Sequence, residues 1–156
     1  MFAKILLWIG TALVLLLVAG LVYGNLTREM TNARVAEEIR HEPEGERAAR
    51  TMLLTMEDGR MYPVNYLYEG NKVFMGIDGF WWREFADEAK PVSMYIKGET
   101  YTGQALTILD RPEYIKDVFS RLRPTVPKWL PDALNGKLVE ITLDPASIEK
   151  IQEAIE

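Results

Sequence analysis

The chain has 156 residues, of which 48% are hydrophobic and 26% are charged, and its formal net charge is −5. It contains one histidine and no cysteine, which excludes thiol nucleophiles, disulfides and zinc sites built from paired His and Cys ligands. The acidic balance and the lack of a basic patch also argue against nucleic-acid binding.

The first segment of the chain is uniformly apolar. From Ile5 to Tyr23 it reads ILLWIGTALVLLLVAGLVY, without a charge. As a helix this run would be about 28 Å long, close to the roughly 30 Å hydrocarbon thickness of a bilayer. A cleaved signal peptide has a shorter apolar core and a small-x-small cleavage site, which this run lacks. We therefore predict a transmembrane anchor over residues 1–24, which contacts membrane lipid through residues 5–23.

The position of basic residues leaves the membrane orientation open. The positive charges before the apolar run are Lys4 and the terminal amine. Those after it are Arg28, Arg34 and Arg40, and glutamates lie between these arginines. We expect a single-pass membrane location, with the side of the soluble domain undetermined.

Residues 25–50 are rich in Arg and Glu and predict a charged helical stalk or linker. Thr27 is the expected N-cap, and the helix is expected to end before Pro43. His41 lies at the end of this segment, without a second histidine to form a metal site, and is expected to be a solvated surface residue.

Beyond Arg50, short alternating segments and turn signals predict six strands. Asp58-Gly59 suits a tight hairpin turn, and similar glycine-bearing turns follow at 69–71 and 97–99. The expected strands are TMLLTM, MYPVNYLY, KVFMGI, PVSMYIK, ETYTGQALTIL and KLVEITL. Mostly hairpin-connected strands of this kind predict a mainly β fold with short helices, a six-stranded antiparallel barrel over residues 51–156.

Three helices are expected within this barrel domain. In FWWREFADEA, the residues Trp82, Phe85, Ala86 and Ala89 share one helical face, which predicts that Trp82 is core and that Trp81 faces a neighbouring surface. DRPEYIKDVFSRLR predicts a helix with Asp110 in a capping box. DPASIEKIQEAIE predicts a closing C-terminal helix with proline at its first position.

A family resemblance covers residues 51 to 144. It is carried by the segments DGRMYPVNYLYEGNKVFMG, PVSMYIKGETYTGQAL and LVEITLDP and by the Trp-bearing helix at 81–89. Together these segments resemble the deazaflavin-dependent nitroreductase family. Its members are split β-barrels related to the flavin-binding pyridoxamine-phosphate-oxidase-like fold. The family pattern has a glycine-bearing loop after the third strand, then a helix with a Trp and a Pro that begins the next strand. These positions look like Gly76, Gly79, Trp82 and Pro91 of this chain.

The resemblance implies a deazaflavin coenzyme or FMN as cofactor, and a homodimer formed through the barrel. In that frame Arg60 would meet a cofactor phosphate, Trp81 would stack on a flat ring and Tyr95 would donate a phenolic hydrogen bond. The cofactor-binding residues implied in this way are Arg60, Gly76, Gly79, Trp81, Tyr95, Lys128 and Trp129.

Two functions remain open from the sequence. The first is a membrane-anchored flavin- or deazaflavin-binding oxidoreductase of nitroreductase or quinone-reductase type, in which the cofactor supplies the chemistry. The second is a non-catalytic membrane-anchored barrel that has lost the cofactor site and binds a protein partner or small ligand. Arg60 is the only cation of the first hairpin, which favours the second function, whereas family precedent favours the first.

Overall fold

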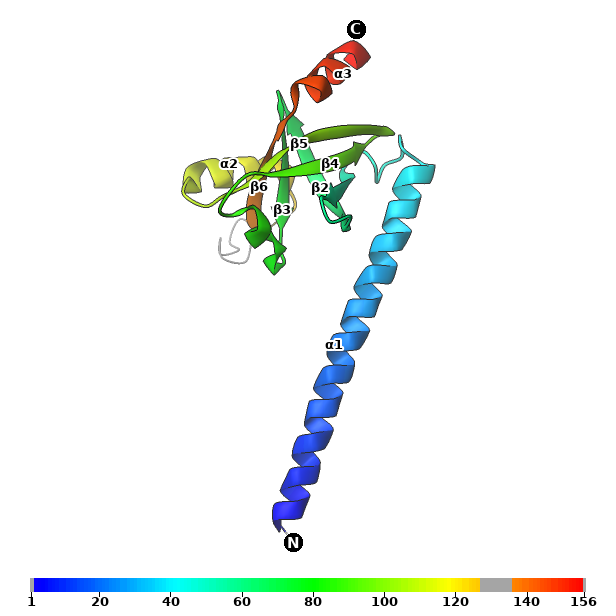
Figure 1. Cartoon of the computed structure of the whole chain (residues 1–156), viewed down its shortest axis with the longest axis vertical. Helices are drawn as coiled ribbons and strands as arrows, with labels where there is room; N and C mark the ends of the chain where they lie inside the picture. Colours follow the sequence, from blue (N-terminus) through cyan, green and yellow to red (C-terminus); the bar gives the residue numbers. More distant parts are fainter. Residues whose placement is uncertain (1, 127–135, 156) are drawn as a thin grey trace. The chain divides into compact units, whose positions relative to one another are not determined.

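The computed structural model describes the backbone of residues 2–126 and 136–155, and the side chains of residues 14–20, 23, 24, 26–126 and 136–151. The chain divides into two compact units, Met1–Glu37 and Glu38–Glu156. Most of the first unit belongs to α1 (Phe2–His41), which is drawn as one unbroken helix (Figure 1).

Helix α1 combines the predicted anchor and the predicted stalk in one element. The hydroxyl of Thr27 donates to the carbonyl of Tyr23 at 2.7 Å, so Thr27 lies inside the helix and its prediction as an N-cap was wrong. The helix ends at His41, before Pro43, as predicted. Within the part of the chain whose side chains are described, no helix is long and apolar enough to cross a membrane. The anchor over residues 5–23 therefore stays a prediction from the sequence.

Six antiparallel strands form a closed barrel in the order β1-β2-β3-β6-β5-β4, which confirms the predicted six-stranded antiparallel barrel. Strands β1, β2 and β3 pair as successive hairpins and so do β4 and β5, whereas β3 and β4 do not pair. β6 lies between β3 and β5, and β4 closes the barrel against β1. The strands are β1 (Thr51–Met56), β2 (Met61–Glu69), β3 (Lys72–Ile77), β4 (Lys90–Ile96), β5 (Glu99–Ile108) and β6 (Lys137–Leu143).

The hairpin turns follow the turn chemistry of the sequence. Gly59, Gly70 and Gly98 adopt φ angles of +84°, +64° and +89°, a region that glycine enters without a steric penalty. Alternate residues of each strand then point into the barrel and form one apolar core. Four methionines contribute to this core, namely Met52, Met56, Met75 and Met94.

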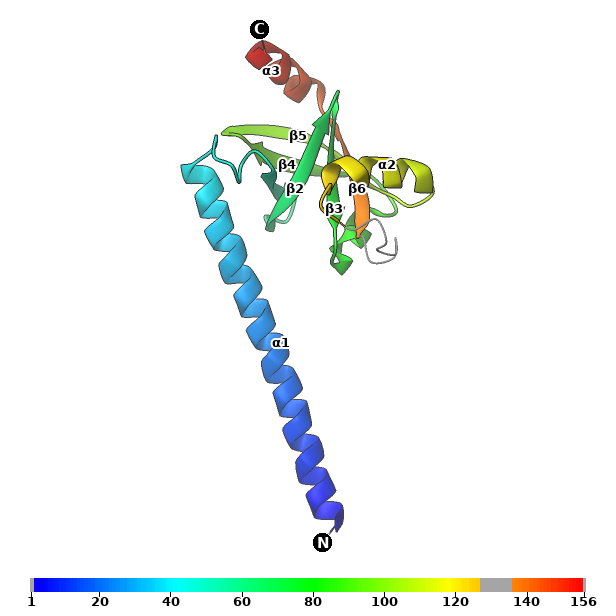
Figure 2. The same cartoon turned by 180° about the vertical axis from the view of Figure 1, so that it is seen from behind.

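Helix α2 (Pro112–Leu122) covers part of the outer surface of the barrel, as seen from behind in Figure 2. Its buried residues Val118, Phe119 and Leu122 form a second cluster with outward side chains of β3, β5 and β6. Arg111 is the N-cap residue of α2 and provides no side-chain hydrogen bond, so the predicted capping box at Asp110 was wrong.

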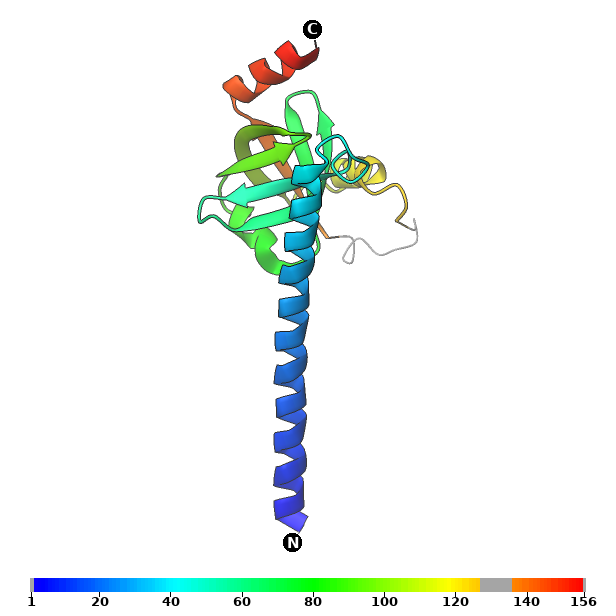
Figure 3. The same cartoon turned by 90° about the vertical axis from the view of Figure 1, so that its right-hand side faces the viewer.

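The two ends of the barrel are covered by different elements (Figure 3). At the η1 end, where β1, β3 and β5 finish, lies the 3₁₀ helix η1 (Phe80–Phe85). At the opposite end lies α3 (Pro145–Ile155), whose first turn is fixed by the Thr102 backbone N–H, which donates to Ser147 Oγ at 2.8 Å. Proline begins this closing helix, as predicted.

The tryptophan pair differs from the prediction because η1 is shorter and more tightly wound than an α-helix. Side chains three residues apart eclipse in a 3₁₀ helix, so Trp82 and Phe85 keep a common face, but η1 ends at Phe85 and Ala86 and Ala89 lie beyond it. Phe85 is fully buried, whereas Trp81 and Trp82 are both half-buried and Ala89 is exposed. Trp82 packs against the core without being fully buried, so its prediction as the core residue was wrong. Phe85, predicted on the same face, is in the core and closes this end.

We expect the Phe85→Ala substitution to lower the free energy of unfolding by about 3 to 5 kcal/mol, because it removes a fully buried aromatic side chain. Guanidinium denaturation of the full chain in mild detergent, followed by circular dichroism, measures this. Phe80→Ala is the matched control, since Phe80 is 77% exposed, and it should change stability by no more than about 0.5 kcal/mol. Equal losses in the two variants would contradict the assignment.

Candidate functional site

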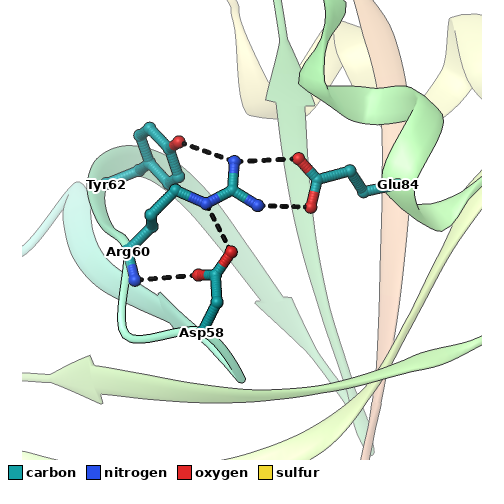
Figure 4. Close-up of polar contacts among 4 residues, drawn as sticks. All are labelled: Asp58, Arg60, Tyr62 and Glu84. Carbon is teal, nitrogen blue, oxygen red and sulfur yellow. Dashed lines mark hydrogen bonds and ion pairs between the residues drawn. The ribbon is translucent and has the colours of Figure 1, made fainter.

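The η1 end holds a group of polar and aromatic side chains that includes sequence-predicted site residues. Arg60 follows the β1–β2 turn, and its guanidinium lies between two carboxylates (Figure 4). Arg60 Nη1 and Nη2 donate to the two carboxylate oxygens of Glu84 at 2.9 and 2.6 Å, while Nε donates to Asp58 Oδ2 at 2.6 Å. The paired, nearly parallel bonds to Glu84 tie the β1–β2 hairpin to η1.

The contacts between Asp58 and Arg60 shift the pKa of both groups. The backbone N–H of Arg60, and then its side chain, hold the pKa of Asp58 below its ordinary value of 3.8. The carboxylates of Glu84 and Asp58 raise the pKa of Arg60, which keeps this guanidinium charged. Arg60 Nη1 also lies 3.4 Å from the hydroxyl of Tyr62.

Tyr62 connects the ionic cluster to the tryptophan pair. Its ring stacks on Trp81 with centroids 4.6 Å apart and an interplanar angle of 14°, and Trp81 meets Phe85 edge to face at 6.1 Å. Gly79 leaves room for the Trp81 ring, because a Cβ at this position would lie 3.1 Å from Trp81 Cδ1. Three predicted site residues, Arg60, Gly79 and Trp81, therefore lie in one part of the molecule.

The other predicted site residues lie elsewhere. Gly76 is on β3 beneath α2, where an added Cβ would meet Arg123 Nη2 at 2.7 Å and Phe119 Cε1 at 2.8 Å. Tyr95 follows the inward-facing Met94 on β4, so it belongs to the outer face of the barrel. Lys128 and Trp129 lie outside the described residues.

A second arginine is held at the β3–η1 turn. Arg123 Nη1 and Nη2 donate to the two carboxylate oxygens of Asp78 at 2.7 and 3.1 Å, and Nη2 also donates to the carbonyl of Gly76 at 3.1 Å. Only 19% of the Arg123 side chain is exposed. Like Arg60, this guanidinium already has a carboxylate partner.

Glu140 organises a third polar cluster, on the outer surface of the barrel. Lys72 Nζ donates to it at 2.7 Å and the Tyr114 hydroxyl donates at 2.6 Å, which joins β3, β6 and α2. Although burial alone raises the pKa of Glu140, these hydrogen bonds outweigh it and lower the pKa. Burial, followed by the bond to Glu140, raises the pKa of Tyr114 to about 12. The cluster fastens α2 to the barrel.

A polar hollow of about 330 Å³ lies beside the start of β1, away from these clusters. The ion pair of Arg47 with Glu38 borders it, as does the pair of Arg50 with Glu46. None of the predicted site residues that the structure describes lines this hollow, whose lining consists of Glu38, Glu46, Arg47, Arg50, Thr51 and Asn65.

Sequence reasoning missed the partners that define the η1 end. Glu84 pairs with Arg60, 24 residues earlier in the chain, and Arg83 contacts aromatic rings. A contact across 24 residues leaves no local spacing signal. The position of Tyr62 two residues after Arg60 is the one cue that places it on the same strand face.

The chain is similar to a few solved structures. No family model and no curated protein matches the chain. A candidate pyridoxamine 5'-phosphate oxidase from Listeria innocua matches with TM-score 0.49 and 11% identity, over 69% of this chain and 92% of that one. A candidate general stress protein 26 from Jannaschia sp. CCS1 matches with TM-score 0.44 and 15% identity, over 72% and 75%.

A third similar structure is a candidate 5-nitroimidazole antibiotic resistance protein from Bacteroides thetaiotaomicron, with TM-score 0.39 and 16% identity, over 62% of this chain and 74% of that one. With all three TM-scores below 0.5, the activities in these descriptions stay with those proteins. The barrel assignment for this chain rests on its own strand pairing.

We expect the Asp58→Asn substitution to reduce thermal stability slightly at pH 6 and progressively less at lower pH. Because the pKa of Asp58 is lowered in the folded state, its stabilising contribution is complete above the ordinary value of 3.8 and is lost as the pH falls through the lowered pKa. Melting curves of both proteins from pH 6 to pH 2.5 measure this. Asp87→Asn, which removes an exposed carboxylate near η1, is the control. A wild-type advantage that persists at the lowest pH would contradict the prediction.

Proposed function

We propose that this chain is a membrane-anchored β-barrel module that acts by binding a protein partner or a small ligand, and that it does not use the flavin-type cofactor site of related barrels. The observation that carries this proposal is the state of Arg60. Three of its nitrogens already donate to carboxylate oxygens of Asp58 and Glu84.

A cofactor phosphate at Arg60 would meet strong competition. It would have to displace a two-bond contact to Glu84 and would then lie beside two carboxylates, which repel an anion at short range. Arg123, the better-buried arginine at this end, is likewise paired, with Asp78. Both guanidinium groups thus stabilise the fold in the arrangement described, which supports a binding role over a flavin-dependent reaction.

The membrane part of the proposal rests on the apolar run of α1. Residues 14–18 are all Val or Leu, and between 51% and 71% of each is exposed. Five consecutive exposed apolar side chains cover every direction around a helix, an arrangement suited to lipid and unfavourable in water. This supports anchoring through residues 5–23.

A flavin- or deazaflavin-dependent oxidoreductase of nitroreductase or quinone-reductase type is the second candidate. The observation that favours it is the half-buried stack of Tyr62 on Trp81, since aromatic faces at a barrel end suit a flat ring system. In this candidate Arg60 would exchange Glu84 for the cofactor phosphate, and a homodimer through the barrel would complete the site.

A cofactor titration distinguishes the two candidates. The full chain in mild detergent is titrated with FMN and, separately, with the deazaflavin coenzyme, and absorption and tryptophan fluorescence are recorded. We expect no saturable change, because Asp58 and Glu84 occupy the cation that a phosphate requires.

The Asp58→Asn/Glu84→Gln double variant is the matched test of this reason, since it removes both negative charges beside Arg60 while keeping side chains of similar size. We expect this variant to bind FMN more strongly than the wild type does. Saturable, stoichiometric binding by the wild type that Trp81→Ala weakens would contradict the binding-module proposal and establish the oxidoreductase candidate.

A further inference from the structure

The η1 end presents a group of apolar and basic side chains, which we call the η1 surface. Phe80, Arg83 and Leu109 in this group are exposed, and Trp82 and Lys137 are half-buried. Phe80 is 77% exposed and Leu109 is 51% exposed. The hydroxyl of Thr107 donates to the carbonyl of Trp82 at 2.8 Å, which places the end of β5 against η1. Leu109 follows two residues later, so it emerges at this same end of the barrel.

The two cations of the η1 surface are held by rings and not by carboxylates. Arg83 Cζ lies 4.9 Å from the ring centroid of Phe80 and 5.4 Å from that of Trp82, and Lys137 Nζ lies 5.9 Å from the Trp82 ring. Within the described part of the chain, neither cation forms an ion pair with a carboxylate. Cation–π contacts orient such groups while leaving N–H donors available to an anion.

We propose that the η1 surface docks on the headgroup layer of the bilayer, where Phe80 and Leu109 insert beside the acyl chains and Arg83 and Lys137 bind lipid phosphates. Exposed aromatic and aliphatic side chains beside Arg and Lys are typical of residues at membrane interfaces. This inference rests on the proposed membrane anchor.

A lipid phosphate suits this surface better than a free phosphate does. Arg83 and Lys137 are two separate side chains on η1 and β6, and two such cations bind a single dissolved anion weakly. A domain tethered to the bilayer meets headgroups at a high effective concentration, at which weak contacts are sufficient. The adjacent apolar side chains have no role in binding a dissolved phosphate.

The charge of the domain limits the kind of lipid contact. Residues 25–156 carry −6, because the whole chain carries −5 and Lys4 is the only charge among the first 24 residues. Asp87 and Asp110 also lie near η1 and Leu109 in the sequence. Docking therefore depends on short-range contacts, and we expect it on zwitterionic phosphatidylcholine without anionic lipid.

The absence of cysteine from the chain allows a clean test with single labels. The full chain carrying Leu109→Cys or Thr100→Cys is labelled with an environment-sensitive fluorophore and reconstituted into phosphatidylcholine nanodiscs that contain headgroup-nitroxide lipid. Position 100 is an exposed site near the start of β5, about 30 Å from position 109, which directly follows the end of that strand. We expect at least twofold stronger quenching of the label at 109.

A second pair of substitutions tests the residues themselves. Phe80→Glu in the Leu109→Cys background should reduce quenching to the level seen at position 100, because it places a carboxylate in the docking surface. Tyr68→Glu, an aromatic-to-acid change at the exposed end of β2, should leave it unchanged. Arg83→Ala should lower the quenching partially, since Lys137 retains one phosphate contact.

The outcomes separate this inference from the proposed function. A chain that does not co-elute with nanodiscs overturns both the anchor and the docking surface. Co-elution with equal quenching at 100 and 109, or with quenching insensitive to Phe80→Glu, overturns the docking surface alone. A label at 109 that becomes shielded with increasing protein concentration in detergent assigns the surface to a second copy and likewise overturns lipid docking.

Discussion

The position of β6 between β3 and β5 is the constraint on which the barrel depends. Strands β1 to β3 form one set of hairpins and β4 and β5 form another, and β6 joins them through ladders on both of its sides. The pairing requires a close approach at Gly103, where a Cβ would lie 2.5 Å from the carbonyl oxygen of Thr142. The interior, the two closed ends and the docking of α2 all follow from this closure.

Core side chains fill the interior of the closed barrel. Residues that bind a ligand or partner must therefore lie at the barrel ends or on the outer surface. At the η1 end the cations fall into two groups. Arg60 and Arg123 are neutralised by carboxylates and fasten loops, whereas Arg83 and Lys137 contact rings. The basic residues of the first group therefore stabilise the fold, whereas those of the second group remain available for recognition.

The sequence predicts the repeating parts of this fold well and the end structures poorly. Strand alternation and glycine turns are local signals, so all six strands and the positive φ angles at Gly59, Gly70 and Gly98 were predictable. The 3₁₀ winding of η1 was not, because its apolar residues fit an α-helical period equally well. The Arg60 contact with Glu84 joins residues 24 positions apart, and only the closed barrel brings them together. The predicted roles of Lys128 and Trp129 concern residues that the structure does not describe.

The methionines of the interior have a consequence for oxidative chemistry. Met52, Met75 and Met94 are fully buried and Met56 is nearly so, and these four come from β1, β3 and β4. Oxidants reach a thioether only when it is exposed, and the resulting sulfoxide is polar and does not fit an apolar core. The rate at which these methionines oxidise therefore reports how often the barrel opens, and each oxidation makes reclosing harder. A protein with this interior converts brief openings under oxidative stress into a loss of the folded state that lasts until the sulfoxides are reduced.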